Sequence, residues 1–108
     1  MPNVTEISVQ DLKARRDKKA AHFLLDVREP HEHDTCRIEG STLIPMSGLR
    51  ERLAEIPKDR EVVVHCHHGG RSAQVAGYLL QNGWTDVKNL AGGIDAWSTD
   101  IDPKVPRY

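Results

Sequence analysis

The stretch VVVHCHHGGRSA (62–73) decides the fold, because it joins a run of β-branched residues to a cysteine, two histidines, a glycine pair and an arginine. EVVVHC (61–66) is apolar on both faces, which is typical of a central parallel strand that is covered on both sides. SAQVAGYLLQNG (72–83) has helical spacing and ends at Gly83. HHGGR is therefore predicted to be a short loop from strand to helix. We expect one side of that helix to face the core, with the side chains of Val75, Ala76, Leu79 and Leu80.

Short β-type runs alternate with helical stretches along the rest of the chain. Strands are expected at 5–9, 22–27, 41–46, 61–66 and 86–90, and helices at 9–20, 47–56, 72–83 and 92–97. Ser47 is the expected N-cap of its helix, which would bury a stripe of Leu49, Leu53 and Ile56. The alternation predicts an α/β fold, an open parallel sheet of about five strands with helices on both faces. At 108 residues the chain fits one domain, 1–108.

The composition is that of an ordinary globular protein, with 38% apolar residues, 29% charged residues and a formal net charge of −1. Because Lys and Arg are spread along the chain, neither nucleic acid nor an anionic membrane is expected as a partner. No apolar run approaches the ~20 residues of a membrane span, and the first residues do not resemble a signal peptide. The cytoplasm is the expected location. There Cys36 and Cys66 are expected to be thiols, and their pairing under oxidation stays open.

Cys66 is predicted to lie at the carboxyl end of a central strand, where open parallel sheets bind their ligands. Gly69 and Gly70 allow backbone angles that turn successive N–H groups inward, and the start of the next helix adds to the same positive field. A thiol in that field loses its proton near neutral pH and becomes a nucleophile. Arg71 would add a fixed charge and bidentate hydrogen bonds to an oxyanion.

This segment has two other interpretations. Cys66 could be a buried, inert cysteine at a strand end, with the glycines only turning the chain. A metal site would use His65, Cys66, His67 and His68, but adjacent residues on one tight turn seldom point at a single ion, and no C-x-x-C or spaced histidine pair is present. The combination of strand, cysteine, glycine pair and arginine favours a functional loop without a metal.

HCHHGGRS (65–72) resembles the Cys-to-Arg loops of two families with related α/β folds. Cysteine-dependent phosphatases have five residues between the cysteine and the arginine, whereas four residues separate Cys66 from Arg71. Rhodanese-like sulfurtransferases use the shorter loop, and the chain is similar to them. A cradle that is one residue smaller encloses a single sulfur atom better than a tetrahedral phosphate. The resemblance extends over two outer motifs, through Asp26, Val27, Arg28, Glu32, Ile38, Gly40, Ile44 and Pro45, and through Leu90, Gly92, Gly93 and Trp97.

This resemblance implies that Cys66 carries sulfane sulfur as a persulfide, from a donor such as thiosulfate to a thiophile such as cyanide or a thiol. Arg71 would position an anionic donor. His67 and His68 could add charge, although solvent-facing rings are favoured for both. The remaining loop residues implied to bind substrate are Gly69, Gly70 and Ser72, whose amides would surround the persulfide. No metal, nucleotide or organic cofactor is required, and a sulfur-accepting protein is a further candidate partner.

A rhodanese-like module that binds partners or senses redox state without turnover is the alternative, and a phosphatase is a third hypothesis. The chain also departs from the family pattern, since Cys36 and Arg37 stand where Gly and His are usual. Cys36 could be a resolving thiol for Cys66, but an inert, partly buried cysteine is favoured. Asp26 and Arg28 are expected to brace loops. The remaining expectations are a core position for Trp97 and a tight turn at Gly92 and Gly93.

Overall fold

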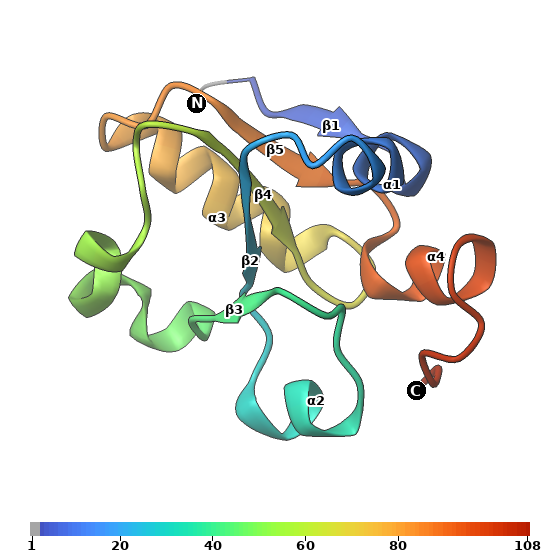
Figure 1. Cartoon of the computed structure of the whole chain (residues 1–108). Coiled ribbons are helices and arrows are strands. Elements are labelled where there is room, and N and C mark those ends of the chain that lie inside the picture. Colours follow the sequence, from blue (N-terminus) through green and yellow to red (C-terminus); the bar gives the residue numbers. More distant parts are fainter. Residues whose placement is uncertain (1–2) are drawn as a thin grey trace.

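The computed structural model describes residues 3–108 and contains a parallel five-stranded sheet of order β1-β5-β4-β2-β3 (Figure 1). The elements in chain order are β1 (Thr5–Ile7), α1 (Val9–Asp17), β2 (His22–Asp26), α2 (Pro30–Thr35), β3 (Thr42–Leu43), the 3₁₀ helix η1 (Met46–Glu55), β4 (Glu61–His65), α3 (Gly70–Gln81), β5 (Val87–Leu90) and α4 (Gly93–Asp100). The predicted α/β fold with a parallel sheet of five strands is confirmed.

Strand β4 lies at the centre of the sheet, between β2 and β5. Its residues pair in parallel with both neighbours, for example Val63 with Leu24 and with Lys88. Because side chains alternate across a strand, Val62 and Val64 pack into one core cluster and Val63 into another. All three valines are fully buried, as expected for a strand covered on both sides.

The two core clusters lie on opposite faces of the sheet, and different helices cover them. Leu49 of η1 and Val75 and Leu79 of α3 join Val62 and Val64 on one face. On the other face, Val63 packs with residues of α1 and α4, which are Val9, Leu12, Ile94 and Trp97. The expected placement of helices on both faces is therefore correct, and Trp97 is a core residue.

Several boundaries differ from the sequence-based expectation. Helix α3 begins at Gly70, two residues early, because Gly69 turns the chain with a φ of 114°. The strand expected at 41–46 pairs only at Thr42–Leu43. The stretch expected to be a helix capped by Ser47 is a 3₁₀ helix that follows Pro45 and is kinked at Arg52.

Helix α2 was not expected from the sequence. It is only six residues long, with Pro30 in its first turn and a capping box between Glu29 and Glu32. A helix this short shows no apolar periodicity, so only its capping residues could have indicated it. Its position matters, because it places Glu32 beside the loop that follows β4. None of the helices within residues 3–108 is long and apolar enough to cross a membrane.

Candidate active site

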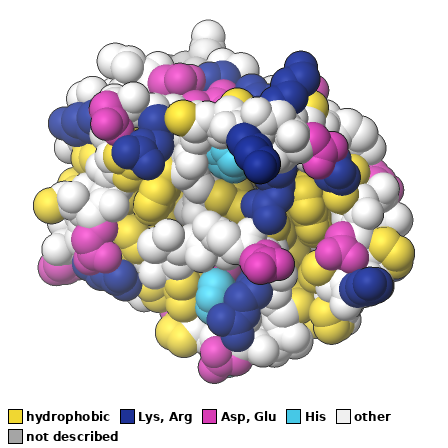
Figure 2. Space-filling model, viewed as in Figure 1, with side chains coloured by type: hydrophobic (Ala, Val, Ile, Leu, Met, Phe, Trp, Pro, Cys, Tyr) yellow, Lys and Arg dark blue, Asp and Glu magenta, His cyan; other side chains and the backbone are white. Residues whose placement is uncertain are grey.

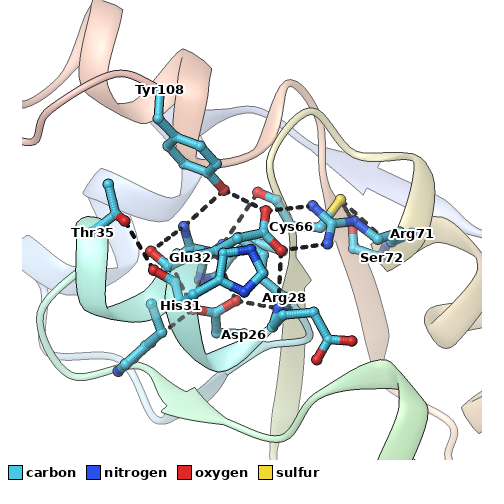
Figure 3. A network of polar contacts seen from close by, with 12 residues as sticks. Asp26, Arg28, His31, Glu32, Thr35, Cys66, Arg71, Ser72 and Tyr108 are labelled. Carbon is cyan, nitrogen blue, oxygen red and sulfur yellow. Dashed lines mark hydrogen bonds and ion pairs between the residues drawn. The ribbon is translucent and has the colours of Figure 1, made fainter.

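The sulfur of Cys66 lies at the carboxyl end of β4 and accepts hydrogen bonds from the loop that follows it (Figure 3). The amide of Gly69 donates to Sγ over 3.1 Å and the amide of Ser72 over 3.4 Å. The Ser72 hydroxyl lies 3.3 Å from the same atom. The backbone of the Cys66 loop (residues 66–71) thus folds around its own sulfur atom, which the left-handed Gly69 makes possible.

The surroundings of Cys66 lower the pKa of its thiol. Its burial, with only 1% of the residue exposed, opposes ionisation. The hydrogen bonds from the Ser72 hydroxyl and amide and from the amides of Gly69 and His68 outweigh this effect. A thiolate at this position is therefore stabilised by oriented N–H and O–H dipoles.

The Ser72 hydroxyl connects Cys66 to β5. Its oxygen lies 2.5 Å from Oδ1 of Asn89, which is buried in β5. The Asn89 amide nitrogen donates to Glu6 and to the carbonyl oxygen of Gly69, which fixes Oδ1 toward Ser72. The hydroxyl carries one proton and has three acceptors within reach, Sγ of Cys66, Oδ1 of Asn89 and the carbonyl oxygen of Gly69.

The first turn of α4 supports the backbone of the Cys66 loop through hydrogen bonds. The amides of Ile94 and Asp95 donate to the carbonyl oxygens of Cys66 and His67, over 3.0 and 3.1 Å. Gly93 permits this approach, because a Cβ atom there would lie 2.5 Å from each of these two oxygens. The glycine pair therefore does more than form the expected turn, since it lets the loop and the helix backbone touch.

Arg71, which ends the loop, pairs with a carboxylate instead of pointing at the sulfur. Its Nη1 and Nη2 donate to Oε1 and Oε2 of Glu32 over 2.6 and 2.8 Å. The Arg71 hydrogen bonds hold the pKa of Glu32 far below its ordinary value, and Glu32 raises the pKa of Arg71. The positive charge of Arg71, which was expected to attract an anionic donor, is thus already paired with the carboxylate of Glu32.

A second buried arginine braces the loops around the site, as expected. Arg28 donates to both carboxylate oxygens of Asp26, over 2.9 and 2.8 Å, and to the carbonyl oxygen of Cys36 over 2.7 Å. Burial opposes ionisation of both Asp26 and Arg28, yet their mutual hydrogen bonds lower the pKa of Asp26 and raise that of Arg28. The pair fixes the segment between β2 and β3 next to the Cys66 loop.

Tyr108 joins these two ion pairs. Its hydroxyl donates to Oε2 of Glu32 over 2.8 Å and accepts from Nη1 of Arg28 over 3.0 Å. Its ring stacks on His67 with a centroid separation of 3.9 Å. Burial and the neighbouring Glu32 raise the pKa of Tyr108 to about 12, so its hydroxyl is a donor at neutral pH. The segment that follows α4 therefore reaches the Cys66 loop (Figure 3).

The three histidines near Cys66 occupy different environments. His68 is exposed, as expected, with Nδ1 3.9 Å from Asp95. His67 lies beneath Tyr108 instead of facing solvent, and burial lowers its pKa. His65 is fully buried under the loop, and burial lowers its pKa to about 4. Within residues 3–108, no cluster of three or more His, Cys, Asp or Glu could hold a metal ion.

The residues expected at the site therefore take different positions. Gly69 and Ser72 donate to the sulfur, Gly70 begins α3, and Arg71 contacts Glu32. Cys36 is a free, buried thiol that lies 3.9 Å from Nη1 of Arg28.

Three residues of this network, Asn89, Glu32 and Tyr108, were not predicted to belong to the site. Asn89 could have been noticed as a polar residue of low β-propensity in a buried strand. Glu32 was noticed only as part of the family pattern, and Tyr108 gives no signal in the sequence.

The profile of the rhodanese-like domain matches residues 8–100. The chain belongs to the rhodanese-like family. It is 41% identical to a protein named sulfurtransferase from Allochromatium vinosum, over 88% of this chain and 89% of that protein. It is 36% identical to the probable adenylyltransferase/sulfurtransferase MoeZ of Mycobacterium tuberculosis, over 94% of this chain but only 26% of that protein.

Solved structures agree with this assignment. A rhodanese-related protein from Thermoplasma volcanium has a TM-score of 0.83 at 35% identity, covering 96% of this chain and 99% of that one. A rhodanese-like domain protein from Staphylococcus aureus has a TM-score of 0.84 at 30% identity, covering 97% and 99%. Family membership and the names of the relatives support sulfur transfer as the general chemistry of this fold.

Proposed function

We propose that this protein moves sulfane sulfur from a donor such as thiosulfate to a thiophilic acceptor, cyanide or a thiol, through a persulfide on Cys66. The observation that carries the proposal is the set of hydrogen bonds from Gly69 and Ser72 to a single sulfur atom. Such donors stabilise a thiolate before reaction and a terminal persulfide sulfur after it.

The reaction has two steps. The Cys66 thiolate attacks the outer sulfur of thiosulfate, a new S–S bond forms, and the old S–S bond breaks with its electron pair leaving on sulfite. The acceptor then attacks the outer sulfur of the persulfide, and the Cys66 thiolate leaves. Cyanide yields thiocyanate by this route. The sulfur enters and leaves without an external oxidant or reductant.

The loop residues take distinct proposed roles. Gly69 and Ser72 hold the thiolate, and the amides from His67 to Ser72, including Gly70, surround the added sulfur. His67 and His68 stay proposed contacts of the donor at the rim. Arg71 contacts the donor only through N–H groups that Glu32 does not use. No cofactor takes part in these steps.

The alternative is a module that binds partners or senses redox state without turnover. The hydrogen bonds to Sγ and the lowered pKa of the Cys66 thiol favour a reactive cysteine over a module that only binds partners, because such a module does not need a stabilised thiolate. A redox sensor would use the same thiolate, and turnover with thiosulfate and cyanide distinguishes it from an enzyme. A phosphatase is disfavoured by the loop, which is one residue shorter than the phosphatase pattern. A sulfur-accepting protein stays a second class of acceptor. The relative MoeZ, which is named an adenylyltransferase/sulfurtransferase, has its similar region within a much longer chain. The single domain 1–108 and the cytoplasmic location stay predictions.

The test is an intact-mass spectrum after incubation with millimolar thiosulfate. The chain is expected to gain about 32 Da, one sulfur atom, and to lose it again with release of thiocyanate when cyanide is added. Cys66→Ser should gain nothing, whereas Cys36→Ser should gain the same mass as the unaltered protein. No gain in mass and no thiocyanate would support the binding module. Hydrolysis of a small aryl phosphate that disappears in Cys66→Ala would support the phosphatase.

A further inference from the structure

Asn89 is a polar side chain in a row of the sheet that is otherwise apolar. It lies in β5, between β1 and β4 (Figure 1), and none of it is exposed to solvent. Its partner on β4 is Val64, and Val87 precedes it on the same face of β5. Both valines belong to the apolar cluster that α3 covers. A buried amide costs free energy unless hydrogen bonds satisfy it, so its partners indicate what it does there.

The hydrogen bonds of Asn89 go to the Cys66 loop and its neighbouring strand. Oδ1 lies 2.5 Å from the hydroxyl of Ser72, and Nδ2 donates to the carbonyl oxygen of Gly69 over 3.2 Å. Gly69 and Ser72 are also two of the residues whose amides donate to Sγ of Cys66. One buried side chain therefore holds two residues that in turn hold the sulfur.

Glu6 determines which way the Asn89 amide points. The two residues face each other on the paired strands β1 and β5, and Nδ2 donates to Oε2 of Glu6 over 2.9 Å. A carboxylate and a backbone carbonyl only accept hydrogen bonds, so Glu6 and Gly69 both require the NH2 end of the amide on their side. The carbonyl end consequently faces Ser72, whose hydroxyl can donate.

We propose that Asn89 is a positioning residue of the proposed sulfur transfer, supported by Glu6, and that it keeps Gly69 and Ser72 where they stabilise the reactive form of Cys66. The inference rests on the proposed function, because it concerns the nucleophile of that reaction. Asn89 acts on the sulfur through the two loop residues and contacts no substrate.

Gly69 benefits from such a restraint because its backbone is unusually free. Its φ of 114° lies in a region that glycine adopts readily and also leaves at little cost. The amide of Gly69 makes the shorter of the two hydrogen bonds to Sγ, over 3.1 Å. Its carbonyl oxygen accepts from Asn89 and from the amide of Ala73 in α3. Without Asn89, the peptide loses a restraint, and its N–H group points at the sulfur for a smaller part of the time.

One effect of Asn89 acts in the opposite direction. Its Oδ1 competes with Sγ for the Ser72 proton, so its removal frees that hydroxyl. The hydroxyl still lies 3.2 Å from the carbonyl oxygen of Gly69, so the sulfur gains only part of one hydrogen bond. An apolar side chain in place of Asn89 would also desolvate a thiolate, which favours the thiol. The loss of positioning is therefore the larger effect.

The rest of the positive field around Cys66 does not depend on Asn89. The loop amides and the start of α3 stabilise a thiolate in every variant. On the face of the molecule that Figure 2 shows, Lys and Arg are interspersed with Asp and Glu, so that face contributes no field of a single sign. Removal of Asn89 should therefore shift the ionisation of Cys66 by about one pH unit and not abolish it.

The test is the pH dependence of Cys66 alkylation in Asn89→Leu, a variant of similar volume, followed by peptide mass. We expect the midpoint to rise by about one pH unit, and the rate constant at a pH below both midpoints to fall roughly tenfold. Trp84→Phe is the control, because it loses a hydrogen bond to Pro57 before the amino end of β5, away from the Cys66 loop. It should be less stable but keep the midpoint. A midpoint that is unchanged or lowered in folded Asn89→Leu would overturn the proposal.

A double variant shows whether Asn89 acts through Ser72. In the Ser72→Ala background, Asn89→Leu should raise the midpoint by less than it does alone, because the hydroxyl that Asn89 contacts is already absent. Equal increments in the two backgrounds would overturn the part of the proposal that concerns Ser72.

Glu6 provides a test that leaves the core intact, because it is exposed on β1. Glu6→Leu removes the acceptor that orients Asn89 and should raise the midpoint, whereas Glu6→Gln keeps an oxygen that can accept from Nδ2. Both variants lose the same charge, so the difference between their midpoints isolates the hydrogen bond. This pair also decides the proposal where Asn89→Leu does not fold, and equal midpoints in the two would overturn it.

Alkylation needs no sulfur donor, so these outcomes are independent of the proposed function. Loading with thiosulfate, followed by intact mass, is measured on the same proteins and should slow roughly tenfold in Asn89→Leu at the same low pH. If the unaltered protein is not loaded, the proposed function fails, whereas the midpoints still decide the role of Asn89.

Discussion

The amide of Ile94 donates a hydrogen bond to the carbonyl oxygen of Cys66 over 3.0 Å, so the helix that ends the fold supports the backbone of the nucleophile. This contact requires the residue before Ile94 to have no side chain. The position of the reactive sulfur thus depends on a glycine that lies 27 positions later in the sequence, at Gly93.

Gly93→Ala is expected to destabilise the protein and to slow sulfur loading. The new Cβ would lie 2.5 Å from the carbonyl oxygens of Cys66 and His67, at a φ of 59° that side chains rarely adopt. A loss of about 1–3 kcal/mol in the free energy of unfolding follows from such strain and overlap. Denaturant unfolding measures it. Gly48→Ala is the control, because its Cβ would meet nothing within 4 Å. Equal stability of the two variants would contradict this account.

Ser72→Ala is expected to move the pH dependence of Cys66 alkylation to higher pH. The variant loses a hydroxyl that lies 3.3 Å from Sγ and lowers the pKa of the thiol. Since the thiolate is the reactive form, the midpoint of the rate against pH should rise by about one unit. Rates with a small alkylating reagent between pH 5 and 10 measure the midpoint. Ser47→Ala, at an exposed position, should leave it in place. A midpoint that does not move would show that the backbone amides alone hold the thiolate.

His65 is expected to make the fold sensitive to mild acid. Burial lowers its pKa to about 4, whereas an unfolded histidine titrates near 6.5. The unfolded chain therefore binds the proton first, and the free energy of unfolding should fall by about 3 kcal/mol as the pH drops from about 6.5 to about 4. Denaturant unfolding at several pH values measures the slope. His65→Leu should reduce it, and His31→Gln, at an exposed site, should not. The low pKa of Glu32 acts only below about 4.5, so the two effects separate.

Tyr108→Phe and Tyr108→Ala are expected to destabilise the protein by different amounts. The phenylalanine variant keeps the ring on His67 but removes the hydroxyl that Arg28 and Glu32 share, which costs about 1 kcal/mol. The alanine variant also loses the stacked ring and should unfold at a lower denaturant concentration. Tyr78→Phe, in the apolar groove with Met46 and Leu49, is the control. An unchanged free energy of unfolding in Tyr108→Ala would show that this tyrosine does not support the site.

The sheet and the Cys66 loop could be predicted because their causes are local. The strand is indicated by three consecutive β-branched residues, and the loop by a strand-end cysteine and a glycine pair. Both signals depend on residue pattern and backbone angles over only a few positions. Helix α2 could not be predicted in this way, because six residues are too few to show a period. The kinked 3₁₀ helix η1 was wrongly predicted as regular, since apolar spacing alone does not separate the two helix types.

The contacts of Arg71 and Arg28 could not be predicted from the sequence for a different reason. Arg71 and Glu32 are 39 positions apart, and Tyr108 and Arg28 are 80 positions apart. Only the packing of α2 and of the segment after α4 against the Cys66 loop brings them together. The expectation that Arg71 faces a donor did not include Glu32 as a competing partner. Glu32 is a capping residue of a short helix, and that position gives no sign that its side chain pairs with Arg71.

The polar chain from Arg71 through Glu32 and Tyr108 to Arg28 joins the Cys66 loop, α2 and the segment after α4. Such a chain makes local opening cooperative, because freeing one segment strands a charge on another. Amide hydrogens of α2, of the Cys66 loop and of the residues before Tyr108 should consequently exchange with solvent deuterium in one concerted event. A molecule bound at the Cys66 loop would then slow exchange at the far end of the polypeptide as well.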